Sequence, residues 1–201
     1  MSVRVMMILA ASLAIGACSS QPAPAAATSA PAAEAPKPRT GPVPPPTTEA
    51  DMIASAVSAA PEAVSKDATV ITMDEKGQMK TLRQGTNGWT CMPDSPSPGV
   101  DPMCVDKNGA EWAMAWMGHK NPPEGKIGFG YMLAGGSDAS NEDPFATTPP
   151  AGGTWVDTGP HVMVLNTHGK VEGYPTNPSN PKAPFVMFAG TPYEHLMIPV
   201  K

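Results

Sequence analysis

The sequence predicts an α+β fold: a single domain in residues 49–201, with two helices, a largely antiparallel sheet of six or seven strands and one disulfide. Three observations support this prediction. Short apolar or alternating segments recur along the chain, two segments carry apolar residues at helical spacing, and the two kinds do not follow a β-α-β order. All of the Trp, Tyr and Phe residues fall in this segment, so the hydrophobic core is expected there.

The first elements of this domain are a helix and a hairpin. A helix is predicted to follow Thr48, which resembles the first residue of a capping box, and to end near Pro61. Strands are predicted at 69–73 and 79–83. The intervening Asp-Glu-Lys-Gly at 74–77 supplies the turn chemistry of a β-hairpin.

The second helix carries two tryptophans. It is predicted to begin at Asn108, with Glu111 three residues later, and to end at Gly118. Trp112 and Trp116 stand at i and i+4 on its surface. Such a pair is typical of a core-facing stripe, and the alternative is that it lines a ligand pocket.

The remaining strands follow in sequence. The segment 126–134 alternates bulky residues with Gly128 and Gly130, which gives one bulky and one bare face. Bare glycines in a strand often mark the close approach of another element, and the tryptophan-bearing helix is expected to be that element. Further strands are predicted at 89–92, 161–166, 185–189 and 195–200.

Cys91 and Cys104 are expected to form the disulfide. The segment between them is rich in proline and must be a loop, and a bridge that closes so short a loop contributes about 3 kcal/mol. The alternatives are a metal-binding or a redox-active dithiol, although the spacing is not Cys-x-x-Cys.

The amino-terminal residues have the features of a secretory signal peptide. Arg4 precedes an apolar run, Val5–Ile15, which is shorter than the about 20 residues that span a bilayer. The run ends in Ile15-Gly16-Ala17-Cys18, which resembles the lipobox of bacterial lipoprotein precursors. The alternative is ordinary secretion with cleavage nearby.

The lipobox resemblance implies cleavage of a signal peptide at 1–17, diacylglycerol on the sulfur of Cys18 and acylation of its new amino group. Several acyl chains anchor a protein durably to a membrane. The expected location is the cell envelope, lipid-anchored at the periplasmic face or the outer membrane. Ser19 mildly favours the outer membrane, because Asp at that position tends to retain lipoproteins in the inner one.

Residues 18–48 are expected to form a tether. Pro and Ala fill 17 of the 30 positions from Ser19 to Thr48, a composition that cannot bury enough apolar surface to fold and is typical of disordered spacers.

The charge of the domain excludes one class of partner. Residues 49–201 contain 10 Lys and Arg against 17 Asp and Glu. Nucleic-acid binding is not expected, because no basic patch is present to neutralise phosphates.

Two His-x-Met segments are the most specific candidate site. His161 and Met163 would share one face of a strand, as would His195 and Met197. If the two strands are neighbours, two imidazoles and two thioethers could bind copper, above all Cu(I). The alternative is that the methionines fill the core and the histidines only hydrogen-bond.

Other candidate sites are weaker. Asp138, Ser140 and Glu142 alternate as Ca²⁺ ligands could, or form a solvated acidic turn. His119 and His168 are expected to face solvent. None of the familiar hydrolase, zinc-protease or nucleotide-binding motifs is present.

The segments Gly88-Trp89-Thr90-Cys91, Pro102-Met103-Cys104 and Gly190–Met197 resemble those of an uncharacterised family of secreted bacterial proteins. The resemblance covers most of residues 65–201 and implies a compact exported domain, with no activity attached. The expected function is a non-enzymatic binding or structural module. The alternatives are a periplasmic copper-binding protein and an envelope enzyme.

Overall fold

A computed structural model describes residues 46–74, 76–95, 99–178 and 180–200. The predicted signal peptide, Cys18 and the tether up to residue 45 lie outside the described residues and stay predictions. In the described part of the chain, no helix has the length and apolar character needed to cross a membrane.

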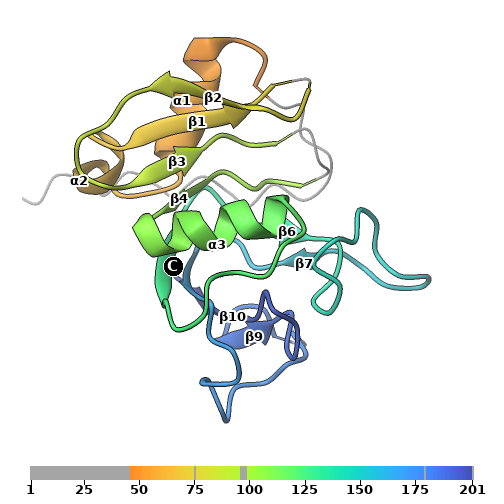
Figure 1. Cartoon of the computed structure of the whole chain (residues 1–201). Helices are drawn as coiled ribbons and strands as arrows, with labels where there is room; N and C mark the ends of the chain where they lie inside the picture. The colour runs from red at the N-terminus through yellow and green to blue at the C-terminus, as the bar shows by residue number, and fades with distance from the viewer. Residues whose placement is uncertain (1–45, 75, 96–98, 179, 201) are drawn as a thin grey trace, which may run out of the picture. The chain divides into compact units, whose positions relative to one another are not determined.

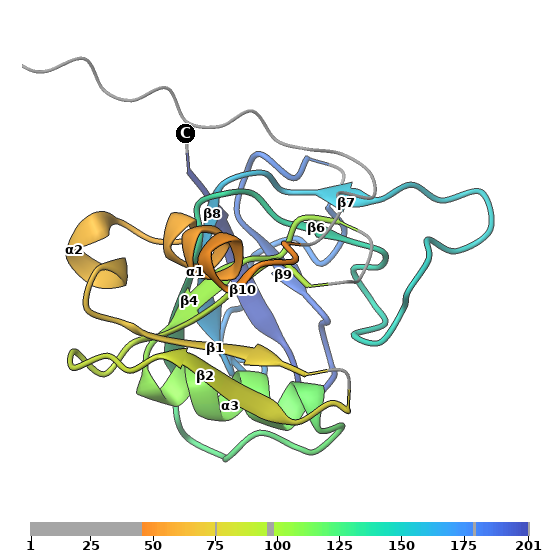
Figure 2. The same ribbon diagram turned by 90° about the horizontal axis from the view of Figure 1, so that it is seen from above.

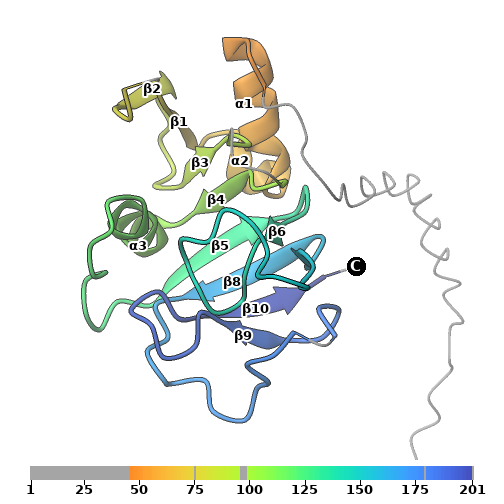
Figure 3. The same ribbon diagram turned by 90° about the vertical axis from the view of Figure 1, so that its right-hand side faces the viewer.

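The fold is α+β, as predicted (Figure 1). Three helices are present: α1 (Glu49–Ser58), α2 (Glu62–Ser65) and α3 (Lys107–Met117). The main sheet has eight strands in the order β2-β1-β3-β4-β5-β8-β10-β9, which runs from top to bottom in Figure 3. A separate small sheet pairs β6 with β7. The strands are β1 (Thr69–Met73), β2 (Met79–Arg83), β3 (Thr90–Met92), β4 (Met103–Val105), β5 (Gly128–Met132), β6 (Ser137–Asp138), β7 (Val156–Asp157), β8 (His161–Leu165), β9 (Phe185–Met187) and β10 (His195–Pro199).

The predicted counts of strands and helices were wrong. All seven segments expected to be strands contain strands, but β4, β6 and β7 were missed. Strands β6 and β7 have two residues each, which is too few to show alternation. The four-residue helix α2 was missed for the same reason. The sheet is mixed, because β1 pairs in parallel with β3 while its other strands pair antiparallel.

The helix ends follow local capping. Thr48 accepts a hydrogen bond from the backbone of Asp51 at 3.1 Å, as predicted for α1. The expected start of α3 at Asn108 was wrong, because Asp106 caps this helix by accepting from Gly109 N at 2.7 Å. Asn108 instead donates its side-chain N–H to the carbonyl of Ile127, which ties α3 to the segment leading into β5.

The two long helices cover opposite faces of the sheet (Figure 2). Neighbouring residues of β4 show this directly. Cys104 packs with the alanines of α1, whereas Val105 packs with Trp112 of α3. Because successive residues of a strand point to opposite faces, α1 and α3 must lie on different sides.

The bare face of β5 lies under α3, as predicted from its glycines. A Cβ on Gly128 would lie 2.4 Å from the backbone nitrogen of Gly109, so only glycine permits this approach. The same face is occupied further along by Met132 and by residues of β8 and β10.

The disulfide between Cys91 and Cys104 is present, as predicted. The two residues are directly opposite on β3 and β4, with Cα atoms 4.0 Å apart, and both are fully buried. The bridge joins two neighbouring strands on the α1 side of the sheet.

Candidate functional site

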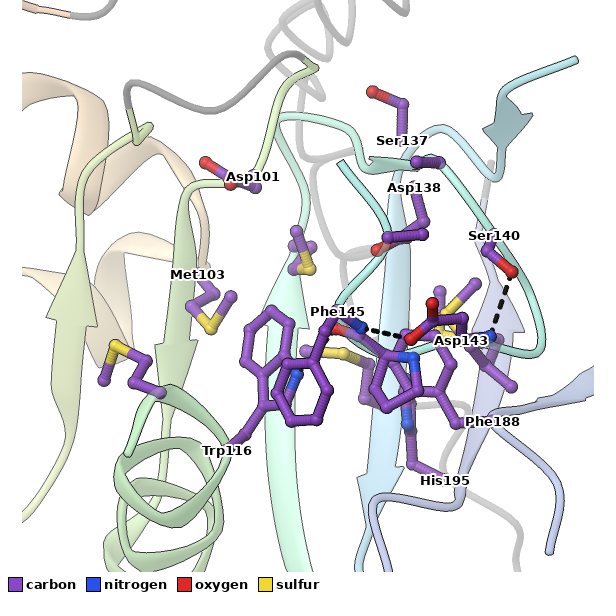
Figure 4. Close-up of a pocket in the computed structure, with 18 of the residues that line it drawn as sticks. Asp101, Met103, Trp116, Ser137, Asp138, Ser140, Asp143, Phe145, Phe188 and His195 are labelled. Atoms are coloured by element: carbon purple, nitrogen blue, oxygen red, sulfur yellow. Dashed lines mark hydrogen bonds between the residues drawn. The ribbon is translucent and has the colours of Figure 1, made fainter. Parts of the chain in front are cut away.

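A pocket of about 450 Å³ opens on the α3 side of the sheet (Figure 4). Its volume lies within the range of small-molecule sites. Its floor comes from β4, β5, β8, β9 and β10, one wall from the end of α3, and another from residues 137–147.

Methionines form most of the floor. Met132, Met163, Met187 and Met197 come from β5, β8, β9 and β10. The strand register explains the grouping: Met163 is directly opposite Met197, and Met187 is directly opposite His195. Cross-strand partners share a face, so thioethers and one imidazole gather on one surface.

Gly130 makes room for this arrangement. It is directly opposite Met163, and a Cβ at Gly130 would lie 2.7 Å from the terminal methyl of that methionine. The methyl group therefore occupies the space that a side chain on β5 would take.

A smaller pocket of about 240 Å³ shares Asp101, Met103, Trp116 and Met117 with the first one. Met73, Met79 and Met92 extend its lining. Nine of the eleven methionines after residue 17 line one pocket or the other, and only Met52 and Met114 do not. Long thioether side chains adapt to differently shaped partners, which is why they are common on binding surfaces.

His195 faces the pocket as a neutral imidazole. Its Nδ1 lies 2.9 Å from the carbonyl of Tyr193, and a carbonyl can only accept, so Nδ1 carries the proton. Burial lowers the pKa of His195 to about 4. Nε2 consequently carries a lone pair, and none of the described residues hydrogen-bonds to it. The ring packs between Trp112 and Phe188, with centroids 5.2 and 5.4 Å away.

Glu194 holds the start of β10 in place beside His195. Burial alone would raise its pKa, but hydrogen bonds from the Gly190 and Gly169 N–H groups and the Thr167 hydroxyl outweigh that effect and lower the pKa of Glu194. Glu194 is therefore a structural carboxylate.

His161 lies outside the pocket. It is fully buried against Gly136, with Nδ1 2.8 Å from the carbonyl of Gly159. Burial lowers the pKa of His161 to about 4, and its Nε2 has no partner among the described residues.

The two histidines lie at opposite ends of the β8–β10 pair. His161 is directly opposite Pro199, whereas His195 is directly opposite Leu165. Each histidine begins its own strand, and antiparallel strands begin at opposite ends. The neighbouring strands that the copper hypothesis requires are present. The pocket, however, gathers His195, Met163 and Met197 without His161.

A carboxyl pair lies at the other end of the pocket. Val100 and Ser137 exchange two hydrogen bonds: Val100 N donates to Ser137 Oγ at 3.1 Å, and Ser137 N donates to Val100 O at 3.3 Å. This contact brings the next residues, Asp101 and Asp138, to the same end of the pocket, the upper end in Figure 4, where His195 lies at the lower end.

The two carboxyls differ in their surroundings. Asp101 accepts hydrogen bonds from the backbone N–H and the hydroxyl of Ser95, both at 2.7 Å. Burial raises the pKa of Asp138 to about 7, and the negative charge of Asp101 adds to this effect. Asp138 is therefore poised to gain or lose a proton near neutral pH.

Aromatic side chains form the wall between the two ends. Trp116 donates its indole N–H to the carbonyl of Pro144 at 3.0 Å, which fastens the loop that carries Phe145. The ring of His119 stacks on Phe145 with centroids 4.0 Å apart. Figure 4 shows Trp116 and Phe145 between the carboxyl pair and His195. The core-stripe interpretation of Trp112 and Trp116 was incomplete, because both also line the pocket.

The proposed Ca²⁺ ligands are not brought together. Asp138 and Ser140 line the pocket, while Glu142 is exposed outside it. The hydroxyl of Ser140 accepts from the backbone of Glu142 and Asp143, which makes it a turn residue. In the described ranges, no three His, Cys, Asp or Glu side chains are gathered closely enough to hold a metal ion.

Sequence reasoning missed the carboxyl pair. Val100 and Ser137, which hold it together, are 37 residues apart and carry no shared motif. His119 and His168 are exposed, as predicted, but His119 also borders the pocket.

No protein-family model, curated protein or solved structure matches this chain.

Proposed function

We propose that this protein is a lipid-anchored binding protein of the bacterial cell envelope, whose domain holds a small, mainly apolar molecule in the pocket on the α3 side. One observation carries the proposal: methionines from four neighbouring strands face one cavity of about 450 Å³ instead of closing it. An open, mainly apolar pocket of this size is typical of small-molecule binding sites.

A neutral fluorescent probe, N-phenyl-1-naphthylamine, tests the pocket. The full chain with Cys18→Ala, which lacks the anchor and keeps every described residue, is expected to bind it saturably with one site. Thr147 is exposed at the pocket edge, so Thr147→Trp should obstruct the cavity and weaken probe binding about tenfold or more.

Thr148→Trp is the matched control, because Thr148 is exposed next in the chain and does not line the pocket. Probe binding should be unchanged in this variant. Absence of saturable binding, or equal loss in both variants, would contradict the proposal.

The anchor part of the proposal rests on Ile15-Gly16-Ala17-Cys18. In cells given labelled palmitate, the native chain should carry the label, whereas Cys18→Ala should carry none. Labelling that persists in Cys18→Ala would place the lipid elsewhere and remove this part of the proposal.

A second candidate is Cu(I) binding. The neutral Nε2 of His195 lies on the surface that also presents Met163, Met187 and Met197. Imidazole and thioether together suit Cu(I), and a ligand histidine typically donates its other N–H to a carbonyl, as His195 does. In this candidate site the fourth ligand is Met187, whereas the sequence had predicted His161 at that position.

Titration with Cu(I) against a competing chelator tests this candidate. One equivalent is expected to bind, and Met163→Leu with Met197→Leu should weaken binding about tenfold or more while keeping the volume of the side chains. Met52→Leu with Met114→Leu is the control, since neither methionine lines a pocket. Equal affinity in the two double variants would exclude the site.

A further inference from the structure

The carboxyl end of the pocket has a specific chemical preference. Asp101, Asp138 and Asp143 line the pocket, and among its described lining residues there is no lysine or arginine. The walls are aromatic, from Trp112, Trp116, Trp155, Phe145 and Phe188. Carboxylates and aromatic faces both attract organic cations.

The pair is built into the fold. The two hydrogen bonds between Val100 and Ser137 fix the backbone on both sides, and Ser95 holds the Asp101 carboxylate. An independent feature points to a ligand in the same cavity. His195, which is only 3 % exposed, lines the opposite end of the pocket, and none of the described residues hydrogen-bonds to its Nε2.

We infer that the ligand of this pocket is an organic ammonium ion with an apolar or aromatic body, whose charged head lies between Asp101 and Asp138 and whose body lies on the methionine floor. The inference rests on the proposed binding function and names its ligand class. An N–H group at the far end of such a ligand would find an acceptor in His195 Nε2.

Binding of this ligand is coupled to a proton. The ammonium ion favours the charged form of Asp138, so binding below neutral pH releases the proton that this carboxyl holds. Affinity therefore rises with pH up to about 7 and is constant above it. Asp157, on the neighbouring strand β7, lies opposite Ser137 and outside the pocket. The other titratable groups that line the cavity are Asp101, Asp143, His119 and His195.

Three probes with one body separate charge from shape: 3-phenylpropylammonium, 3-phenylpropan-1-ol and 3-phenylpropanoate. Each is titrated into the Cys18→Ala chain by calorimetry, and displacement of N-phenyl-1-naphthylamine confirms the site. At pH 8 the ammonium is expected to bind about tenfold more tightly than the alcohol, and the carboxylate most weakly. Below pH 7 its Kd should rise by up to about tenfold per pH unit, with no such change for the alcohol.

Asp138→Asn is the decisive variant, because the amide keeps the shape and removes the charge. It should abolish both the preference for the ammonium and its dependence on pH. Asp157→Asn, in the same two-stranded ribbon, should change neither. Circular dichroism checks that both variants fold.

Two results would overturn the inference and leave the binding function standing: equal affinity for ammonium and alcohol, or an ammonium preference that survives in Asp138→Asn. If neither these probes nor N-phenyl-1-naphthylamine binds, the binding function itself fails.

Discussion

The two faces of the sheet have been built in different ways. On the α1 side, the core is an alanine cluster of small residues: Ala56, Ala59, Ala60, Ala68, Val70, Cys91 and Cys104. On the α3 side, the core is a methionine cluster of long and aromatic residues: Val105, Trp112, Ala113, Met132, Met163, Leu165, Phe185, Met187, Phe188, Tyr193 and Met197.

The consequence is visible in the cavities. No member of the alanine cluster lines either pocket, whereas seven members of the methionine cluster line the larger one: Trp112, Met132, Met163, Leu165, Met187, Phe188 and Met197.

 Small side chains let helix and sheet approach closely, whereas long thioethers and rings leave space that they can adapt to fill.

The covalent cross-link and the pocket therefore lie on opposite faces of the sheet. The alanine cluster holds the covalent cross-link and no titratable side chain, and the methionine cluster borders the pocket, the buried histidines and Asp138. The first three tests below perturb one side at a time, from the largest expected effect to the smallest.

Loss of the disulfide should have the largest effect on stability. Replacing both Cys91 and Cys104 by Ala is expected to lower the free energy of unfolding by about 3 kcal/mol, because the unfolded chain gains the entropy of an open loop. Urea unfolding of the Cys18→Ala chain, with and without these changes, measures the difference. Probe binding in the pocket should survive under native conditions. Loss of binding in a folded variant would show that the two sides are not separate.

Acid should destabilise the methionine side. His161 and His195 have pKa values of about 4 when folded and near 6.5 when unfolded, so between these values only the unfolded chain takes up their protons. Stability is therefore complete above about pH 6.5 and falls toward pH 4. Asp138 acts in the opposite direction, since its folded pKa of about 7 exceeds the unfolded value of 3.8. Because two histidines oppose one aspartate, the free energy of unfolding is expected to fall by on the order of 1 kcal/mol for each unit by which the pH is lowered.

Urea unfolding at pH 4.5, 5.5 and 6.5 measures this slope. His161→Gln should make the profile nearly flat, because His195 and Asp138 then oppose each other, and Asp138→Asn should make it about twice as steep. His168→Gln is the control, since His168 is exposed. If the slope is the same in His161→Gln and Asp138→Asn as in the parent chain, these buried groups do not cause the pH dependence of stability.

Two glycines of β5 should differ in their tolerance of a methyl group. Gly128→Ala is expected to cost about 2 kcal/mol, because the new Cβ would meet the backbone of Gly109. Gly130→Ala should cost less than about 1 kcal/mol, because the nearest atom is the movable methyl end of Met163. Thermal unfolding of the two variants compares them, and equal costs would mean that the methionine floor is as rigid as the helix contact.

Much of the fold was predictable from local pattern. The segments that form β1, β2, β3, β5, β8, β9 and β10 show alternation or continuous apolarity. The glycine at position 128 correctly indicated the close approach of α3. The parallel pairing of β1 with β3 was not predictable, because it depends on how the hairpin folds back on β3. The start of α3 was misplaced because Asn108 and Asp106 are both good capping residues, and only the tertiary contact of Asn108 with Ile127 decides between them.

The candidate site was predictable only in part. The two His-x-Met segments drew attention to Met163, His195 and Met197, which do face the pocket. Alternation within each strand could not reveal that His161 and His195 lie at opposite ends of the strand pair, since that depends on the register of β8 with β10. The pairing of Asp101 with Asp138 needed the contact between Val100 and Ser137, and no local signal encodes it.

The sequence by itself determined seven of the ten strands in the described residues, the two longer helices, the α+β class, the disulfide partners and the expectation of a lipid anchor at Cys18. These depend on residue type and short-range spacing, which a chain carries before it folds. Only the tertiary structure decided which methionines share a face, which histidine meets the pocket and which carboxyls are neighbours. Those features depend on strand order and register, and these are set by the packing of segments that are distant in the chain.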